Sequence, residues 1–329
     1  MANKQIRDDV TVLIPSYLRP EQLTACVESI ADGEVLPKTV LVVHREDDKD
    51  TMQAIETLKT SVDAFLVERA SVDVAGHIPP VETGVSHCET EYVALLDDDT
   101  EVKPDWLCEL MAPFDDPSVG VVGGPAVVPD MQSKTSDPDA GRLRVTGQLG
   151  GGLMWCTEGG IRDVDNVPEG NSAWRTDLLQ SIDIPPFLRE GDSKFYGFYL
   201  TLSAREHGYR VLFNPKAFIW HYPGERAPSL DRTDQHRQHW LSSRNYALIA
   251  LRKMALSRVL AYYLHSFLVG TYGDVGLLRA LHMLLTGDDK WRCAVSCGKG
   301  RLDALRQYLG RSVGSRSEEK KSHSPSSAQ

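Results

Sequence analysis

Short apolar runs alternate with helix-like periodicity along the first hundred residues. Four runs have the length and composition of buried strands: residues 10–14, 40–43, 62–67 and 92–96. Between them, apolar side chains recur every three or four positions, which predicts helices with one buried face near residues 20–32, 52–58 and 79–88. Strands that alternate with helices predict an α/β fold, with a mostly parallel sheet and helices on both faces.

The pattern is less regular after the fourth predicted strand. Residues 119–128 indicate a β segment broken by glycines, and residues 130–170 indicate loops with short strands. A helix over residues 200–206 and strands over residues 211–213 and 217–220 follow.

The last third of the chain changes character. Residues 235–285 have the pattern of amphipathic helices, whereas residues 312–329 lack apolar side chains and are expected to be disordered. We therefore expect an α/β domain over residues 8–230, a helical appendage over residues 231–311, and the disordered tail.

Charge and cysteine content narrow the class of protein. The 329 residues contain 36 Lys and Arg against 46 Asp and Glu, a net charge of −10, which disfavours nucleic-acid binding. The six cysteines form no pattern of metal ligands, so we interpret them as reduced thiols of a cytoplasmic protein. No apolar secretion signal opens the sequence, and no apolar run reaches the roughly 20 residues that span a bilayer.

Three consecutive carboxylates follow the fourth predicted strand directly. Ligands of open α/β sheets bind outside the carboxyl ends of the strands, which is where Asp97, Asp98 and Asp99 would lie. Two further polar clusters, residues 16–19 and 44–48, follow the first and second strands and should meet the aspartates at this edge.

Neighbouring carboxylates repel one another unless a cation neutralises them. In an extended chain Asp97 and Asp99 point the same way and Asp98 the other way. The outer two could therefore share a hard divalent ion that also binds a diphosphate. The alternative is a turn in which these residues cap the helix near Pro104.

Five segments carry a resemblance to a known family: VTVLIPSYLRPEQLTACVESI, EYVALLDDDTEVKPDWL, VPEGNSAWRTDLL, LSAREHGYRVLFNPKAFIWHYPGER and SSRNYALIALRK. In this order they resemble family 2 glycosyltransferases, which are inverting enzymes of the GT-A fold that use nucleotide-diphosphate sugars. The resemblance covers roughly residues 9–252. It implies a GT-A mixed, mostly parallel sheet, followed here by C-terminal amphipathic helices.

The resemblance also assigns the donor and acceptor sides of the site. Four residues would line the nucleotide pocket: Pro15, Ser16, Tyr17 and Arg19. Glu46 or Asp47 would contact the base, because HREDDKDT replaces the family's usual Asp-Asp/Asn-Gly-Ser. Gly170 and Asn171 would shape the sugar and acceptor side, or would form only a turn.

The metal site follows from the same comparison. Asp97 and Asp99 would hold Mg²⁺ or Mn²⁺ against the diphosphate, with Asp98 nearer the sugar. His221 matches a histidine that approaches the metal or diphosphate in some relatives. Its alternative is an ordinary hydrogen-bonded histidine at a strand end.

The chain departs from the family in one segment. Members usually carry an acidic pair near the start of the helix that ends here at Arg205, and one of those carboxylates takes the acceptor proton. Phe198 and Tyr199 occupy that place in this chain. The nearest carboxylates are Glu190 and Asp192. We favour Asp192 as the base, the alternative being a plain solvated loop acid.

The C-terminal helices contain clustered Leu, Tyr and Phe side chains. They fit a core, a homodimer contact, or a face lying on the inner surface of the cell membrane. In the last case Arg258, Arg279 and Lys290 could meet anionic lipid.

The resemblance thus implies a metal-dependent, inverting hexosyltransferase of polysaccharide biosynthesis. It would move a sugar from a nucleotide-diphosphate donor to a glycan, lipid-linked or small-molecule acceptor hydroxyl. The missing acidic pair allows an alternative, a non-catalytic nucleotide-sugar-binding subunit of a glycan assembly complex. A nucleotidyltransferase is a weaker third hypothesis, because no Gly-rich, Lys-containing phosphate loop follows the first strand.

Overall fold

The computed structural model describes four stretches of the chain: residues 4–129, 136–224, 234–271 and 273–322. The chain divides into two compact units: Met1–Arg144 with Leu149–Asp231, and Val145–Gln148 with Arg232–Gln329. The expected domain boundaries at residues 230 and 311 stay predictions, and residues 225–233 lie outside the described stretches.

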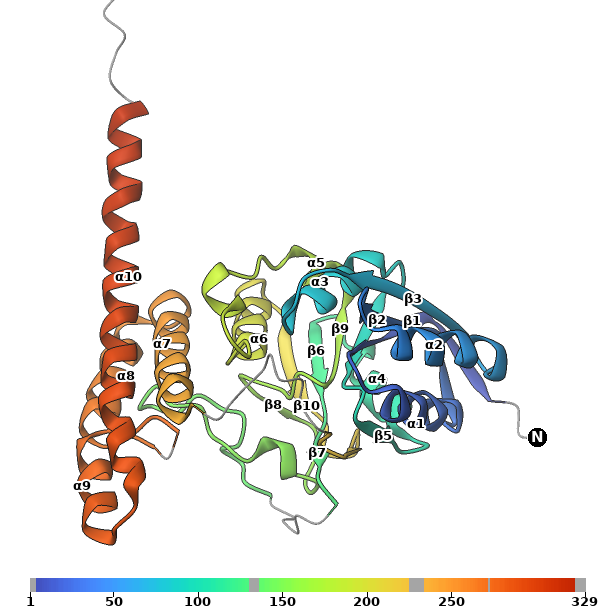
Figure 1. The fold of residues 1–329 in the computed structure, drawn as a ribbon, viewed down its shortest axis with the longest axis horizontal. Coiled ribbons are helices and arrows are strands. Elements are labelled where there is room, and N and C mark those ends of the chain that lie inside the picture. Colours follow the sequence, from blue (N-terminus) through green and yellow to red (C-terminus); the bar gives the residue numbers. More distant parts are fainter. Residues whose placement is uncertain (1–3, 130–135, 225–233, 272, 323–329) are drawn as a thin grey trace, which may run out of the picture. The chain divides into compact units, whose positions relative to one another are not determined.

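The first unit is built on an eight-stranded mixed sheet (Figure 1). In spatial order its strands are β3 (Leu66–Val72), β2 (Val35–Arg45), β1 (Gln5–Ser16), β4 (Tyr92–Leu96), β9 (Asn171–Arg175), β6 (Val119–Gly123), β10 (Arg210–Phe213) and β8 (Arg162–Asp163). The first four strands along the chain run parallel, whereas β9 runs antiparallel to both of its neighbours. The mixed, mostly parallel sheet predicted from the sequence is confirmed.

Helices cover both faces of this sheet. They are α1 (Pro20–Ala31), α2 (Lys49–Ser61), α3 (Ile78–His87), α4 (Trp106–Met111), α5 (Thr176–Ser181) and α6 (Tyr196–Glu206), with short 3-10 helices at Ala112–Asp115, Leu153–Trp155 and Pro186–Arg189. Val12 and Ile14 of β1 join a buried core with α1, α2 and α4. Leu13 faces α3 instead, so closely that a Cβ atom on Gly84 would lie 2.2 Å from its Cδ1. Successive β1 side chains therefore enter opposite layers.

A second, three-stranded sheet belongs to the same unit. Its strands are β5 (Thr100–Val102), β11 (Ile219–His221) and β7 (Ala126–Val127). β11 pairs antiparallel with β5 in a register that sets His221 opposite Thr100. This pairing brings a residue from late in the unit beside the aspartates that follow β4.

Two differences from the predicted strands bear on the site: the start of the third strand and the presence of β9. The third strand begins at Leu66 rather than at residue 62, because α2 continues to Ser61 and Val62 is its C-cap. The second case is β9, whose sequence Asn-Ser-Ala-Trp-Arg shows neither an apolar run nor strict alternation. Ser172 is fully buried in β9, since the strand lies between β4 and β6 in the middle of the sheet.

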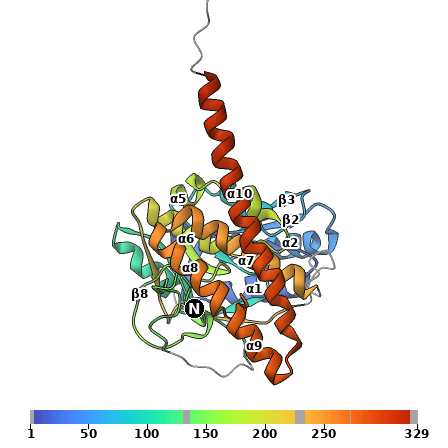
Figure 2. The ribbon, with the colours of Figure 1, turned by 90° about the vertical axis from the view of Figure 1, so that its left-hand side faces the viewer.

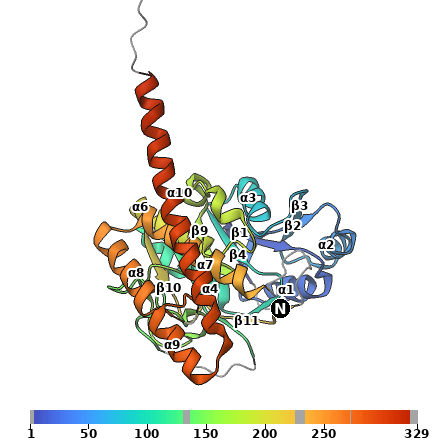
Figure 3. The ribbon, with the colours of Figure 1, turned by 60° about the vertical axis from the view of Figure 1, so that its left-hand side comes forward.

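The second unit is helical, and its helices confirm the amphipathic pattern. They are α7 (Gln235–Lys253), α8 (Leu256–Leu268), α9 (Leu277–Thr286) and α10 (Cys293–Ser322), with a 3-10 helix at Asp289–Arg292. Figures 2 and 3 show α7 and α10 side by side. A small core contains Val275, Met283, Cys293 and Cys297.

The C-terminal end of the described chain is helical. α10 continues to Ser322, into the segment 312–329 for which the sequence predicts disorder. Residues 323–329 lie outside the described stretches, and the disorder stays a prediction. Among the residues that the structure describes, no helix has the length and apolar character to cross a membrane.

Candidate active site

The aspartate triplet begins where β4 ends, between β1 and β9. The backbone N–H of Asp97 donates to the carbonyl of Gly170 at 3.2 Å, and the Thr100 hydroxyl donates to the carbonyl of Asp97 at 2.7 Å. These bonds turn the chain from β4 into β5. A turn and a cluster of carboxylates therefore coexist at this position.

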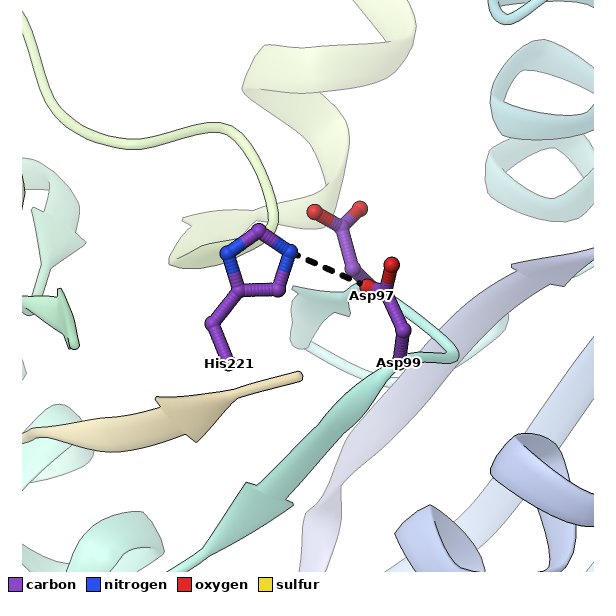
Figure 4. Close-up of side chains that lie close together, drawn as sticks. All are labelled: Asp97, Asp99 and His221. Atoms are coloured by element: carbon purple, nitrogen blue, oxygen red, sulfur yellow. Dashed lines mark ion pairs between the residues drawn. The ribbon is translucent and has the colours of Figure 1, made fainter. Parts of the chain in front are cut away.

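Asp97 and Asp99 lie beside His221 (Figure 4). Each of the three offers one ligand atom, and these atoms lie within 4.8 Å of one another, a spacing that one metal ion can bridge. His221 Nε2 is 3.3 Å from Asp99 Oδ1. The backbone N–H of Tyr222 donates to the Asp99 carbonyl at 2.8 Å, so the pairing of β11 with β5 holds the imidazole at the carboxylates.

Asp98 bonds to the turn after β1. Its Oδ2 accepts from the Ser16 hydroxyl at 2.8 Å, and its Oδ1 accepts from Arg19 Nη1 at 2.8 Å. The same Arg19 nitrogen donates to Asp99 Oδ2 at 2.9 Å. One guanidinium thus bridges two neighbouring carboxylates and offsets their mutual repulsion.

The buried charges shift one another's proton affinity. Burial raises the pKa of Asp98 to about 6, although Arg19 and the Ser16 hydroxyl favour its charged form. Burial also opposes ionisation of Asp99, but His221 and Arg19 outweigh it and hold the pKa of Asp99 below its usual value. The hydrogen bond to Asp99 raises the pKa of His221. The local field therefore favours an ionised Asp99 beside cationic partners.

Gly170 flanks Asp97 so closely that no side chain fits between them. A Cβ atom on Gly170 would lie 2.0 Å from Asp97 Oδ2. Gly170 therefore lies at the candidate site, where the resemblance placed it, and its missing side chain leaves room for the carboxylate.

The side chain of Asn171 is occupied by the protein itself. Its Oδ1 accepts from Trp106 Nε1 at 2.8 Å, and its Nδ2 donates to the carbonyls of Pro125 and Ala217, each at 2.8 Å. The residue is fully buried. Asn171 therefore braces α4 against the segments that lead to β7 and β11.

The expected nucleotide pocket lies at the end of β1. Pro15 and Ser16 are the last residues of that strand. The Arg45 guanidinium lies over the ring of Tyr17, 4.7 Å from its centroid, and also pairs with Asp47 at 2.6 Å. The turns after β1 and β2 are therefore in contact. A nucleotide pocket lined by both turns requires such a contact.

Of the acidic residues after β2, Asp48 is buried, whereas Glu46 and Asp47 are exposed. Asp48 Oδ2 accepts from the backbone N–H of Leu18 at 2.5 Å, and its Oδ1 accepts from that of Thr51 at 3.1 Å, which caps α2. Leu18 has a φ of 57°, in the left-handed region. Asp48 belongs to the polar cluster 44–48 that was expected at this edge, but its capping role was not predicted, although an acid three residues before Thr51 at a helix start is an N-cap signal.

The loop before α6 contains unusual backbone. Ser193 and Phe195 have φ angles of 55° and 67°, which residues with side chains rarely adopt. The Asp192 side chain is only 5% exposed, and its carboxylate lies 3.2 Å from Lys194 Nζ. Glu190 is exposed. Of the two carboxylates expected near the acceptor, Asp192 is therefore the one that the loop buries.

Glu169 is a further carboxylate at the start of α6, and it was not predicted as a site residue. Its Oε1 accepts from the backbone N–H of Gly197 at 2.8 Å, and a Cβ atom on Gly197 would lie 2.1 Å from Glu169 Cγ. Burial raises the pKa of Glu169 to about 7, and the charge of Asp97 adds to this effect. The segment before β9 thus places a carboxyl group at the start of α6, where the acidic pair is missing. No local sequence signal marks it, because two distant segments must meet to create it.

Known proteins share this architecture. The family model described as "Glycosyltransferase like family 2" matches residues 7–243. The mannosyltransferase PcManGT from Pyrobaculum calidifontis, in complex with GDP-Man and Mn²⁺, has a TM-score of 0.58 at 15% identity, over 91% of this chain and 87% of that chain. S. aureus TarS 1–349 has a TM-score of 0.54 at 15% identity, over 92% of both chains. GalNAc-T7 with UDP, GalNAc and Mn²⁺ has a TM-score of 0.55 at 15% identity, over 76% and 48%.

No curated protein matches the chain. Structural likeness at 15% identity establishes the fold, which is GT-A. The family match extends over well more than half of the chain, from β1 into α7, and includes the aspartate triplet and His221. The chain therefore belongs to glycosyltransferase family 2 and is a glycosyltransferase of the GT-A fold.

Proposed function

We propose that this glycosyltransferase is metal-dependent and inverting, and that it transfers a hexose from a nucleotide-diphosphate sugar to an acceptor hydroxyl. The observation that carries the proposal is the convergence of Asp97, Asp99 and His221 on one point. The similar structures include complexes with GDP-Man and Mn²⁺ and with UDP-GlcNAc, which support this class of donor.

The donor atoms of this cluster suit Mn²⁺ and Mg²⁺. Carboxylate oxygens from Asp97 and Asp99 are hard ligands that both ions prefer, and the His221 imidazole favours Mn²⁺ over Mg²⁺. When bound, the ion would neutralise the diphosphate and stabilise it as a leaving group.

We further propose that the nucleotide lies along the turn after β1. Pro15 and Tyr17 would border it, and Glu46 or Asp47, both exposed, would reach the base. Arg19 would stay beside the phosphates and hold Asp98, through its 2.8 Å bond, on the sugar side. Gly170 has no side chain that would displace the Asp97 carboxylate from this edge.

An inverting transfer needs a group that takes the proton of the acceptor hydroxyl. We propose Asp192 for this role, because its side chain is buried and its carboxylate lies 3.2 Å from Lys194 Nζ. Glu190 is the weaker candidate because it is exposed. Glu169 is an alternative candidate for the base. Its carboxyl group lies at the start of α6, and the charge of Asp97 helps to raise its pKa.

Nucleotide release from a panel of UDP-, GDP- and dTDP-sugars tests the proposal. We expect release that requires Mn²⁺ or Mg²⁺ and falls at least about a hundredfold in Asp99→Asn, because the leaving group loses its charge stabilisation. Asp183→Asn changes an exposed loop carboxylate in the same way and should behave like the wild type.

Two results would contradict the proposed reaction. Metal-dependent nucleotide binding without release from any donor would favour the non-catalytic subunit. Pyrophosphate release from a nucleoside triphosphate would favour a nucleotidyltransferase.

The base is assigned by comparing Asp192→Asn with Glu169→Gln in an acceptor-transfer assay. The base is the residue whose variant loses transfer but keeps metal-dependent nucleotide binding. Full transfer in Asp192→Asn would exclude our first assignment.

The acceptor, the location in the cell and the oligomeric state are also proposals. We propose a glycan or lipid-linked acceptor in polysaccharide biosynthesis, as the family resemblance implies, and a place on the cytoplasmic side of the membrane. The homodimer that the sequence allows is tested by light scattering.

A further inference from the structure

The second unit carries a charge opposite to that of the rest of the chain. Residues 234–310 contain eleven Lys and Arg against five Asp and Glu, a net charge of +6. The whole chain carries −10, so the remaining residues carry −16. Such an asymmetry within one chain indicates a negatively charged partner for the basic part.

Helix α8 exposes an apolar face. Its exposed members are spaced by three or four residues along the helix: Leu256, Leu260, Leu264, Phe267 and Leu268. The buried side of the same helix contains Val259, Tyr262 and Ser266. The solvent side of α8 therefore exposes these five large apolar side chains beside only two polar ones, Ser257 and Arg258, which is unusual for a surface helix.

Helix α9 repeats this arrangement. Its exposed side includes five leucines, Leu277, Leu278, Leu281, Leu284 and Leu285, beside His282 and Thr286, and Leu285 is 86% exposed. Its buried side contributes Met283 to the small core. α8 and α9 are neighbouring orange helices in Figures 2 and 3. We call the exposed apolar side chains of α8 and α9 the leucine surface.

Positive charge accompanies the leucine surface. Between residues 254 and 287 the chain contains two strong bases, Arg258 and Arg279, and one acid, Asp274. Asp274 Oδ1 accepts from Arg301 Nη2 at 2.6 Å, so its charge is balanced inside the unit. A broad apolar face with basic neighbours is typical of helices that lie in the interface of an anionic membrane.

We propose that the leucine surface docks on an anionic lipid bilayer, with the leucines among the acyl chains and Arg258 and Arg279 at the headgroups. A symmetric contact with a second copy would bring two basic surfaces together. A nucleic acid would match the charge but would leave the leucines in water. A lipid surface satisfies both features, and the inference does not depend on the proposed reaction.

Flotation of the full chain with vesicles tests this proposal. We expect the chain to float with phosphatidylcholine vesicles that contain about 30 mol% phosphatidylglycerol, and about tenfold less with phosphatidylcholine alone. Leu260→Asp combined with Leu281→Asp should lower flotation at least about tenfold, because charge enters the apolar face. Raising NaCl to about 0.5 M should weaken binding of the wild type.

The matched control is Ile6→Asp combined with Ile161→Asp, which makes the same change in charge at two exposed isoleucines of the first unit. The control should float like the wild type, and an equal loss in both variants would overturn the role of the leucines. A wild type that does not float with anionic vesicles would overturn the proposal. So would a wild-type homodimer that becomes a monomer in the leucine variant but not in the control. Slower hydrogen exchange in α8 and α9 on vesicles, with unchanged circular dichroism of both variants, would give independent support.

Discussion

Gly170 shows how one missing side chain shapes the candidate site. The residue ends the loop before β9, and Asp97 fills the space where its Cβ atom would lie. Any larger residue must push either the carboxylate or the strand away. The position of Asp97 in the proposed metal site therefore depends on a residue whose side chain offers no ligand atom.

Gly170→Ala should displace Asp97, since the new Cβ atom would lie 2.0 Å from its Oδ2. We expect the affinity for Mn²⁺ to fall at least about tenfold, measured by titration calorimetry. Gly151→Ala is the control, because a Cβ atom at Gly151 meets nothing within 4 Å. Unchanged affinity in Gly170→Ala would argue that Asp97 is not a ligand.

Glu169 gives a pH dependence whose sign can be worked out. Burial raises its pKa to about 7, from an ordinary value of 4.5, so the folded chain binds this proton more tightly than the unfolded chain. Its contribution to stability is full below about pH 4.5 and is lost as the pH rises to about 7. In the wild type this loss should lower the free energy of unfolding by about 1–3 kcal/mol as the pH rises, and Glu169→Gln should remove that decline.

Urea denaturation at pH 5 and pH 8 without divalent metal measures that decline. Glu28→Gln, at an exposed position of α1, should keep the pH dependence of the wild type. An identical decline in Glu169→Gln would show that the carboxyl group at residue 169 is not buried in solution.

Among the elements, β9 joins the two halves of the sheet. It pairs antiparallel with β4 on one side and with β6 on the other. Asn171, its first residue, adds three side-chain hydrogen bonds to Trp106, Pro125 and Ala217. The strand therefore fixes the end of β4, where the aspartates lie, from the side opposite β1.

Asn171→Ala should destabilise the first unit by about 3–5 kcal/mol, because it leaves a buried indole N–H and two carbonyls without their partner. Urea denaturation measures the change. Gln53→Ala, at an exposed position of α2, should stay within about 0.5 kcal/mol of the wild type. An equally small change in the free energy of unfolding of Asn171→Ala would mean that water replaces the hydrogen bonds of the Asn171 amide.

The elements that the sequence predicts are those marked by a continuous apolar run or by apolar residues at helical spacing. Tyr92–Leu96 is an apolar run and forms β4 with the predicted bounds, and Leu23, Cys26, Val27 and Ile30 form the buried side of α1. β9 has no such signal, because Asn171, Ser172 and Arg175 leave only two apolar residues in it, and its place in the sheet follows from its pairing with β4 and β6. The position of Glu169 at α6 follows from β9 and could not be predicted without it.

At the scale of the whole molecule, metal binding should be visible as stability. A ligand at about 100 times its Kd stabilises the folded state by about 2.7 kcal/mol, so saturating Mn²⁺ should raise Tm by several degrees in calorimetry. Asp97→Asn and Asp99→Asn should abolish the shift, whereas Asp183→Asn should retain it. An equal shift in all four proteins would place the bound ion elsewhere.

The antiparallel strand β9 has a consequence for how the protein is made. Its partners β4 and β6 leave the ribosome first, and the gap between them stays open until Asn171–Arg175 is translated. At roughly 5–20 residues per second, the chain from Leu96 to Asn171 takes about 4–15 s. During that interval β4 has an unpaired edge of five buried residues. A nascent chain that pauses there would expose an aggregation-prone strand, so synthesis rate or a chaperone should govern the yield of this enzyme.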